Sequence, residues 1–438
     1  MISAQNHRPL LSGNKPVLFV LIFLLLQSCG LFNLPDKSGS KDPEFGIEKN
    51  ESPDLTVEEN TKPDIERPSE EDTLAGVYPL VLKDYYNIVL FMPLFLDREM
   101  QENKGVQRIS RIAQDYLLGF EKAVDTIITC GGKYHIRVVD TRADSFKVSF
   151  ALDTMNPDSI DLIIGPFSKK CIGVLSKYSQ EHQIPMFSPF QSRRDLLREN
   201  PYFIAAEPNQ KVLANNLAQI LNSKYQHTPI FIIRQDTLPS EEFVKELRKK
   251  LQKEKFTIIE DFKTTEKGSL RIGKYLERPI LDGSIVIIPG NNKGFISNVL
   301  SYFRRQEKLD SVTLFGTGTM MEFENIDDQF MGKYRTHFLT DYYVNYEDIQ
   351  VQKFVKTYRS EYNMEPSSFN IEGYDAGLFT LINQHNYGKY FQRGLYFTSF
   401  EALHNKYLFN RAGKGGWYIL NSHLLRYHNY KIEPVKLN

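Results

Sequence analysis

Short apolar runs alternate with amphipathic helical patterns from residue 86 to the end, and this alternation constrains the fold more than any other feature. Each run is bounded by proline, glycine or charged residues, which is typical of strands buried on both faces of a parallel sheet. In the helical segments between them, such as 112–128, apolar side chains recur at three- and four-residue steps. Alternating strands and helices predict right-handed crossovers on a parallel sheet.

The alternation occurs in two series, one before and one after about residue 205. A single core rarely grows beyond roughly 250–300 residues, so a chain of 438 residues is expected to form more than one unit. We therefore predict an α/β protein with two doubly wound parallel-sheet lobes and a cleft between them. In open α/β sheets, ligands bind at the carboxyl ends of the strands.

Composition excludes several function classes. Lys and Arg number 54, as do Asp and Glu, so the basic surplus of a nucleic-acid-binding protein is absent. Three cysteines are too few for a disulfide scaffold or a cysteine-built metal site. Cys130 and Cys171 form either a disulfide or two buried thiols, and the second reading is favoured because Cys171 falls on an apolar helix face. The histidines show no metal spacing and no G-x-S-x-G motif occurs, so we predict neither an enzyme nor a cofactor.

The amino terminus has the pattern of an export signal. Residues 17–26 are ten consecutive apolar residues, whereas a membrane-spanning helix needs about 20. Ser28 and Cys29 follow closely, and this sequence resembles the cleavage box of bacterial lipoproteins. The resemblance implies that residues 1–28 are removed and that Cys29 receives lipid, palmitate included. The alternative is an uncleaved signal anchor with an incidental cysteine.

Residues 29–85 are predicted to form an acidic, flexible tether. The stretch 41–75 contains twelve acidic and four basic residues, several prolines and few large apolar side chains. Such a segment cannot bury enough surface to offset the entropy of ordering, and its charges repel one another. With the lipid at Cys29, it predicts a protein anchored in the cell envelope, facing the periplasm, on the outer membrane.

Six short phrases of the folded part follow one another at 92–94, 118–123, 161–166, 184–189, 354–358 and 373–376. Together they resemble the type I periplasmic ligand-binding proteins, the branched-chain amino-acid-binding family in the broad sense. The chain looks most like the Bacteroidota lipoproteins of this family and is similar to the lobes of penicillin-binding protein activators. The resemblance implies a hinge crossed three times, near 204–208, 340–344 and 413–417. Lobe one would be 86–204 with 345–412, and lobe two 205–344 with 413–438.

The candidate ligand-binding residues of lobe one follow two predicted strands. They are Ser168, Ser188, Gln191 and Ser192. In amino-acid-binding relatives, small hydroxyl residues at such places hold the ligand carboxylate, and Ser168 and Ser188 match that pattern. Helix capping is the alternative role for both serines. Phe167 and Phe190 depart from the family pattern, because bulky rings there would fill the cleft.

The candidates of lobe two are Asp236 and Asn291. Asp236 is the best-placed acid to meet the ammonium group of an amino acid, and Asn291 follows a later strand. Both lie among turn-forming residues, so a purely structural turn is the alternative.

Two functions remain open. The first is a membrane-anchored, non-catalytic protein that captures a small polar ligand, an amino acid or a peptide-like solute, in the cleft. The second is a ligand-free interaction protein that docks to or regulates a peptidoglycan synthase. An open polar cleft would favour the first function and a filled one the second.

Overall fold

The computed structural model describes residues 83–96, 103–129, 131–264, 272–275, 279–323, 327–397 and 399–435. The predicted signal peptide, most of the tether, Cys29 and Cys130 lie outside these residues. In the described part, no helix combines the length and the apolar character needed to cross a membrane.

The first sheet has seven strands in the order β13-β14-β5-β4-β3-β1-β2, and all except β13 run parallel. In β1, Ile88 and Leu90 face one side of the sheet, whereas Val89 and Phe91 face the other. Because both faces are covered by helices, β1 is apolar without alternation from Ile88 to Met92. The strands are β1 (Tyr86–Met92), β2 (Tyr134–Asp140), β3 (Leu162–Ile164), β4 (Met186–Ser188), β5 (Phe203–Ala205), β13 (Phe409–Arg411) and β14 (Trp417–Ile419).

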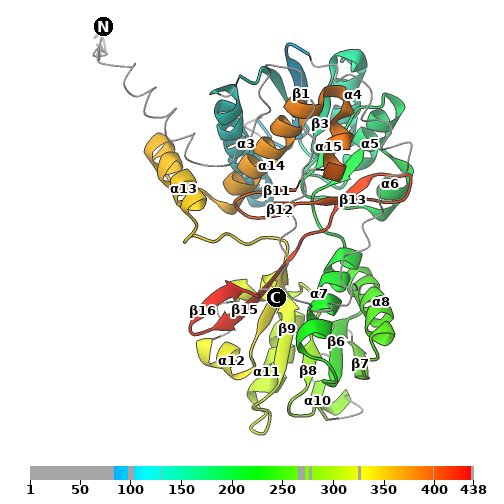
Figure 1. The fold of residues 1–438 in the computed structure, drawn as a ribbon, viewed down its shortest axis with the longest axis vertical. Coiled ribbons are helices and arrows are strands. Elements are labelled where there is room, and N and C mark those ends of the chain that lie inside the picture. The colour runs from blue at the N-terminus through cyan, green and yellow to red at the C-terminus, as the bar shows by residue number, and fades with distance from the viewer. Residues whose placement is uncertain are drawn as a thin grey trace, which may run out of the picture. The chain divides into compact units, whose positions relative to one another are not determined.

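Helices cover both faces of this sheet, as Figure 1 shows. On one face lie α3 (Lys104–Thr129), α14 (Ser368–Tyr387) and α15 (Phe391–Phe397). On the other face lie α4 (Ser145–Asp153), α5 (Ile172–Glu181) and α6 (Arg194–Glu199). The remaining elements of this lobe are α13 (Ile349–Tyr362), the short turns η3 (Pro157–Ser159) and η5 (Gly388–Tyr390), and the two-stranded β11 (Phe400–Glu401) and β12 (Lys406–Tyr407).

The second sheet also has seven strands, in the order β16-β15-β10-β9-β8-β6-β7. It is parallel from β7 to β10, and β15 and β16 are added antiparallel. The strands are β6 (Ile230–Gln235), β7 (Ile258–Thr264), β8 (Ile285–Ile287), β9 (Thr313–Thr317), β10 (His337–Thr340), β15 (His423–His428) and β16 (Lys431–Pro434). The helices are α7 (Gln210–Lys224) and α8 (Leu238–Lys253) on one face, and α10 (Ile272–Tyr275), α11 (Lys293–Arg304) and α12 (Asp328–Lys333) on the other, with η4 (Gly318–Glu322) after β9. The predicted class, α/β with two doubly wound sheets, is confirmed.

The chain passes between the two lobes three times, from β5 to α7, from β10 to α13 and from β14 to β15. The third passage covers residues 420–422, later than the predicted 413–417. The assignment of 413–438 to lobe two is therefore wrong for residues 413–419, because β14 pairs with β5 of the first sheet. The side chain of Trp417 in β14 is 2% exposed and packs in the core of lobe one.

Two local sequence patterns give different structures from those they predict. The pattern of 417–420 and 424–435 predicts one β-hairpin, but β14 and β15 belong to different sheets, and the hairpin is made by β15 and β16. The pattern near 400–403 predicts a short helix, but this segment contains strand β11, which pairs with β12. A short apolar stretch can form a helix or pair with any of several strands, and only the assembled sheets decide which structure it adopts.

Candidate functional site

A cavity of about 840 Å³ opens at the carboxyl ends of the parallel strands of lobe two. Its wall includes Gln235 at the end of β6, Gly290 after β8 and Thr317 at the end of β9. Lobe one contributes Ser368 and Glu372, both in the first turns of α14. The cavity is therefore lined from both lobes and is of the size that holds a small molecule.

The lining of the cavity is both apolar and polar. Its apolar side chains include those of Leu213, Leu217, Phe243, Ile287, Phe315 and Leu339. Two hydroxyl groups fix the loop after β8: Ser240 Oγ donates to Pro289 O at 2.8 Å, and Thr317 Oγ1 donates to Gly290 O at 2.8 Å. These bonds shape the rim before any ligand arrives, which lowers the cost of binding.

Four carboxylate residues line the cavity, Glu207, Glu322, Asp341 and Glu372, and none of the described residues that line it is Lys, Arg or His. Burial raises the pKa of Glu207 to about 8; the charge of Asp341 adds to the rise and Lys169 opposes it. Burial also raises the pKa of Glu372 to about 7, with His404 opposing the rise. A positive charge in the cavity would favour the ionised forms of Glu207 and Glu372 and so lower both pKa values.

The lobe-one candidates lie outside the lining of this cavity. Ser188 is fully buried, and its Oγ donates to Gln191 O at 3.1 Å across a turn. Ser168 Oγ accepts from Lys170 N at 3.3 Å, also within a turn. Ser192 Oγ is buried without a hydrogen-bond partner in the described structure. Ser168 and Ser188 thus bond within turns and cap no helix, since the N-caps of the helices that follow are Cys171 and Arg193. Ligand contact by the four residues stays a prediction.

Three aromatic rings pack together in lobe one, two of them close in sequence to the predicted carboxylate-binding serines. Phe167 lies 4.9 Å from Tyr116 and 4.8 Å from Phe190, between ring centroids, and Tyr116 lies 5.5 Å from Phe190. All three contacts have edge-to-face geometry, which is favourable for aromatic pairs. Phe167 and Phe190 pack against the core of lobe one, and the expectation that they fill the cleft stays a prediction.

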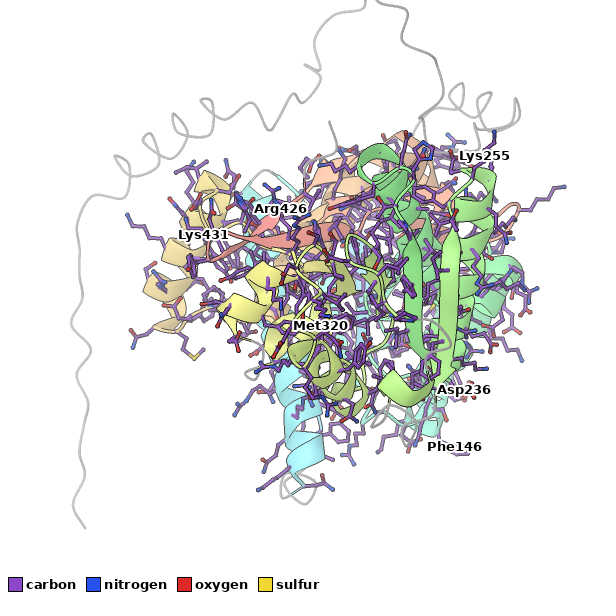
Figure 2. All side chains as sticks on the ribbon, turned by 90° about the horizontal axis from the view of Figure 1, so that it is seen from below. Phe146, Asp236, Lys255, Met320, Arg426 and Lys431 are labelled. Atoms are coloured by element: carbon purple, nitrogen blue, oxygen red, sulfur yellow. The ribbon has the colours of Figure 1, made fainter. Side chains whose placement is uncertain are left out.

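We expect Phe167→Ala to lower the free energy of unfolding by about 2 kcal/mol, because it removes a ring that two other rings contact. The matched control is Phe146→Ala in α4, because the side chain of Phe146 is 83% exposed and lies at the periphery (Figure 2). Urea unfolding of both variants measures the difference. Equal stabilities would contradict the packing role of Phe167.

The two lobe-two candidates differ in position. Asn291 is exposed and lines the cavity. Asp236 is exposed outside the lining, and its Oδ1 lies 2.8 Å from Nζ of Lys263 on the neighbouring strand β7 (Figure 2). A ligand ammonium at Asp236 would have to displace this lysine. The structure therefore brings only Asn291 of the six predicted residues to the cavity wall.

Comparison with known proteins identifies the family. The family model described as the receptor family ligand binding region matches residues 118–379, which is more than half of the chain. The chain belongs to this family. No curated protein sequence matches the chain.

Several solved structures with the same fold are substrate-binding or ligand-binding proteins of ABC transporters. A substrate-binding protein from Desulfitobacterium hafniense in complex with Leu has a TM-score of 0.57 at 17% identity, covering 80% of this chain and 100% of that one. A branched-chain amino acid transporter periplasmic ligand-binding protein from Burkholderia xenovorans has a TM-score of 0.60 at 13% identity, covering 80% and 94%. An ABC-type branched-chain amino acid transporter protein from Rhodopseudomonas palustris has a TM-score of 0.59 at 13% identity, covering 80% and 95%. The predicted recognition, the type I periplasmic binding protein fold, is confirmed.

Within this family fold, the sequence reasoning missed the acids of the cavity. Glu207 lies in the first passage between the lobes and Asp341 in the second, both inside segments that the sequence marks as crossings. Glu372 directly precedes Gly373, in one of the phrases that carries the family resemblance. The sequence signal that could have found Glu207 and Asp341 is an acidic residue within a predicted crossing between the lobes, since such a residue lies next to the cleft.

The described residues contain no group of three or more His, Cys, Asp or Glu side chains that could hold a metal ion. Cys171 is a free, buried thiol, and burial raises its pKa, so it is no reactive nucleophile.

Proposed function

We propose that this chain is a non-catalytic solute-binding protein, anchored by lipid at Cys29 in the cell envelope, that captures a small polar solute carrying a positive charge. The supporting observation is a cavity of about 840 Å³ whose described lining includes four carboxylate residues and no basic residue. A cation pairs favourably with the ionised forms of Glu207 and Glu372, because burial has removed much of the hydration of these two groups. Family membership supports ligand binding as the role of the lobes.

The solute we propose differs from a branched-chain amino acid. An amino acid needs a partner for its carboxylate, and the residues close in sequence to the expected serines are Phe167 and Phe190, which pack with each other and with Tyr116. The wall of the cavity offers acids, hydroxyl groups and apolar side chains. This chemistry suits an amine with an uncharged body, such as a polyamine or the amino group of a peptide-like solute.

The test is a thermal-shift screen of the full chain with spermidine, putrescine, zwitterionic amino acids and muropeptides. A ligand at a hundredfold excess over its Kd stabilises the folded state by about 3 kcal/mol, so we expect a clear rise in Tm with at least one amine. The matched variant Glu372→Gln should weaken that rise, whereas Phe146→Ala should not.

The outcomes separate the alternatives. A rise with zwitterionic amino acids alone would contradict the charge assignment and keep the solute role. No rise with any compound would contradict solute capture. That result would favour the second function, docking to a peptidoglycan synthase, which the aromatic filling of lobe one supports.

A further inference from the structure

A buried carboxylate in α14 holds a loop of lobe one. Asp375 is 0% exposed. Its carboxylate accepts from the backbone N–H groups of Leu403 at 3.0 Å and His404 at 2.9 Å, and it lies 2.5 Å from His404 Nδ1. These three donors satisfy the buried charge and fix the loop at 402–405, which joins β11 to β12. Neither Asp375 nor His404 lines the cavity.

The same loop holds two of the three passages between the lobes. The carbonyl oxygen of His404 lies 2.9 Å from His423 Nε2, at the end of the third passage, and accepts from Tyr343 N at 3.4 Å in the second. Asn405 continues the connection: its Nδ2 donates to Asp341 O at 3.3 Å, and its Oδ1 accepts from Asn421 Nδ2 at 2.5 Å.

Charged and titratable groups surround His404 on every side. They are Asp375 and Glu372 from α14, Asp341, Tyr342 and Tyr343 from the second passage, His423 from the third, and Tyr407 from β12. Burial alone would lower the pKa of His404, but the hydrogen bond and charge of Asp375, with the charges of Glu372 and Asp341, outweigh burial and raise it. Burial lowers the pKa of His423, so the neutral form of His423 is favoured.

We propose that Asp375 and His404 form a hinge clasp in which the proton on His404 decides how firmly the second and third passages are held to lobe one. Protonated His404 donates a charge-assisted hydrogen bond to Asp375, which is stronger than the bond from a neutral ring. Asp375 and His404 are thus positioning residues for lobe movement, and the proposal does not depend on which solute fills the cavity.

The direction of the pH effect follows from the raised pKa of His404. The extra stabilisation is fully present below the ordinary pKa of about 6.5 and is lost as the pH rises through the raised folded value. The hinge clasp is therefore firm in mildly acidic conditions and loosens as the pH increases.

The experiment is hydrogen–deuterium exchange of the full chain across a pH series, corrected for the intrinsic exchange rate, in peptides that cover 341–345, 402–406 and 420–423. Three forms are compared: wild type, His404→Asn, which keeps a donor near the Nδ1 position but cannot titrate, and His404→Leu, which has no donor. The control is His385→Asn, because His385 lies in the last turn of α14.

We expect exchange in these peptides to rise about fivefold to tenfold in wild type as the pH increases, the difference between a charged and a neutral hydrogen bond. His404→Asn should remove this pH dependence, His404→Leu should exchange rapidly at every pH, and His385→Asn should behave as wild type. A wild-type pH dependence that persists in His404→Asn would overturn the proposal, and this variant decides the matter even if His404→Leu does not fold. A merely structural role would change exchange at every pH alike and leave its pH dependence in place.

Discussion

Gly373→Ala is expected to lower the free energy of unfolding by about 3 kcal/mol, because two helix backbones touch at this position. A Cβ atom on Gly373 would lie 2.1 Å from Tyr116 O of α3, and a Cβ on Gly119 would lie 1.9 Å from Asn370 O of α14. The two glycines thus let α3 and α14 approach directly. An alanine methyl group at either position must push the helices apart, since backbone atoms cannot rotate away.

The matched control is Gly173→Ala in α5. A Cβ on Gly173 would meet nothing within 4 Å, and the position is exposed. Alanine favours the helix there, so a gain of up to about 1 kcal/mol is expected. Urea unfolding of both variants gives the comparison. Equal stabilities of Gly373→Ala and Gly173→Ala would contradict the close contact of the helices.

The helix contact also positions the candidate site. Glu372 is the residue before Gly373, and Asp375 follows two positions later. A shift of α14 would therefore move both the cavity carboxylate and the hinge clasp. We expect Gly373→Ala to reduce solute binding as well as stability.

Glu207→Gln is expected to stabilise the protein by about 2 kcal/mol at pH 9 and to change its stability little at pH 5. The pKa of Glu207 is raised to about 8 from its ordinary 4.5. At a pH between these two pKa values, Glu207 keeps its proton in the folded state and has released it in the unfolded state. The free energy of unfolding of the wild type therefore falls as the pH rises. A pKa shift of this size corresponds to a loss of stability of at most about 5 kcal/mol. The expected value of about 2 kcal/mol is smaller because solvent screens the charge of a half-buried group.

The measurement is denaturant unfolding at pH 5 and pH 9. The matched control is Glu322→Gln, a carboxylate of the same cavity that is exposed and lies 3.8 Å from Lys293 Nζ. This control should keep the wild-type pH dependence. If Glu207→Gln kept the wild-type pH dependence of stability, the ionisation of Glu207 would not destabilise the folded state.

The fold was predictable because its signals are local. The apolar runs and helical periodicities report burial on two faces of each sheet, and their order in the chain predicts the crossovers. The candidate site was much less predictable. Ser188 and Gln191 follow the right strand, but Ser188 Oγ bonds to Gln191 O within its own turn. Whether a hydroxyl group faces a cleft or a turn depends on rotamers that the sequence pattern does not report.

The sequence by itself determined the two doubly wound lobes, since strand and helix periodicity follow from which side chains must leave water. It also showed the bulk at Phe167 and Phe190, which departs from the pattern of small residues that the family resemblance implies. Only the tertiary structure decided which acids meet in the cavity, where the third passage lies, and that Asp375 holds His404. Asp375 and His404 are 29 positions apart in the sequence, and the cavity acids come from different lobes. A local sequence pattern does not report contacts between residues so far apart in the chain.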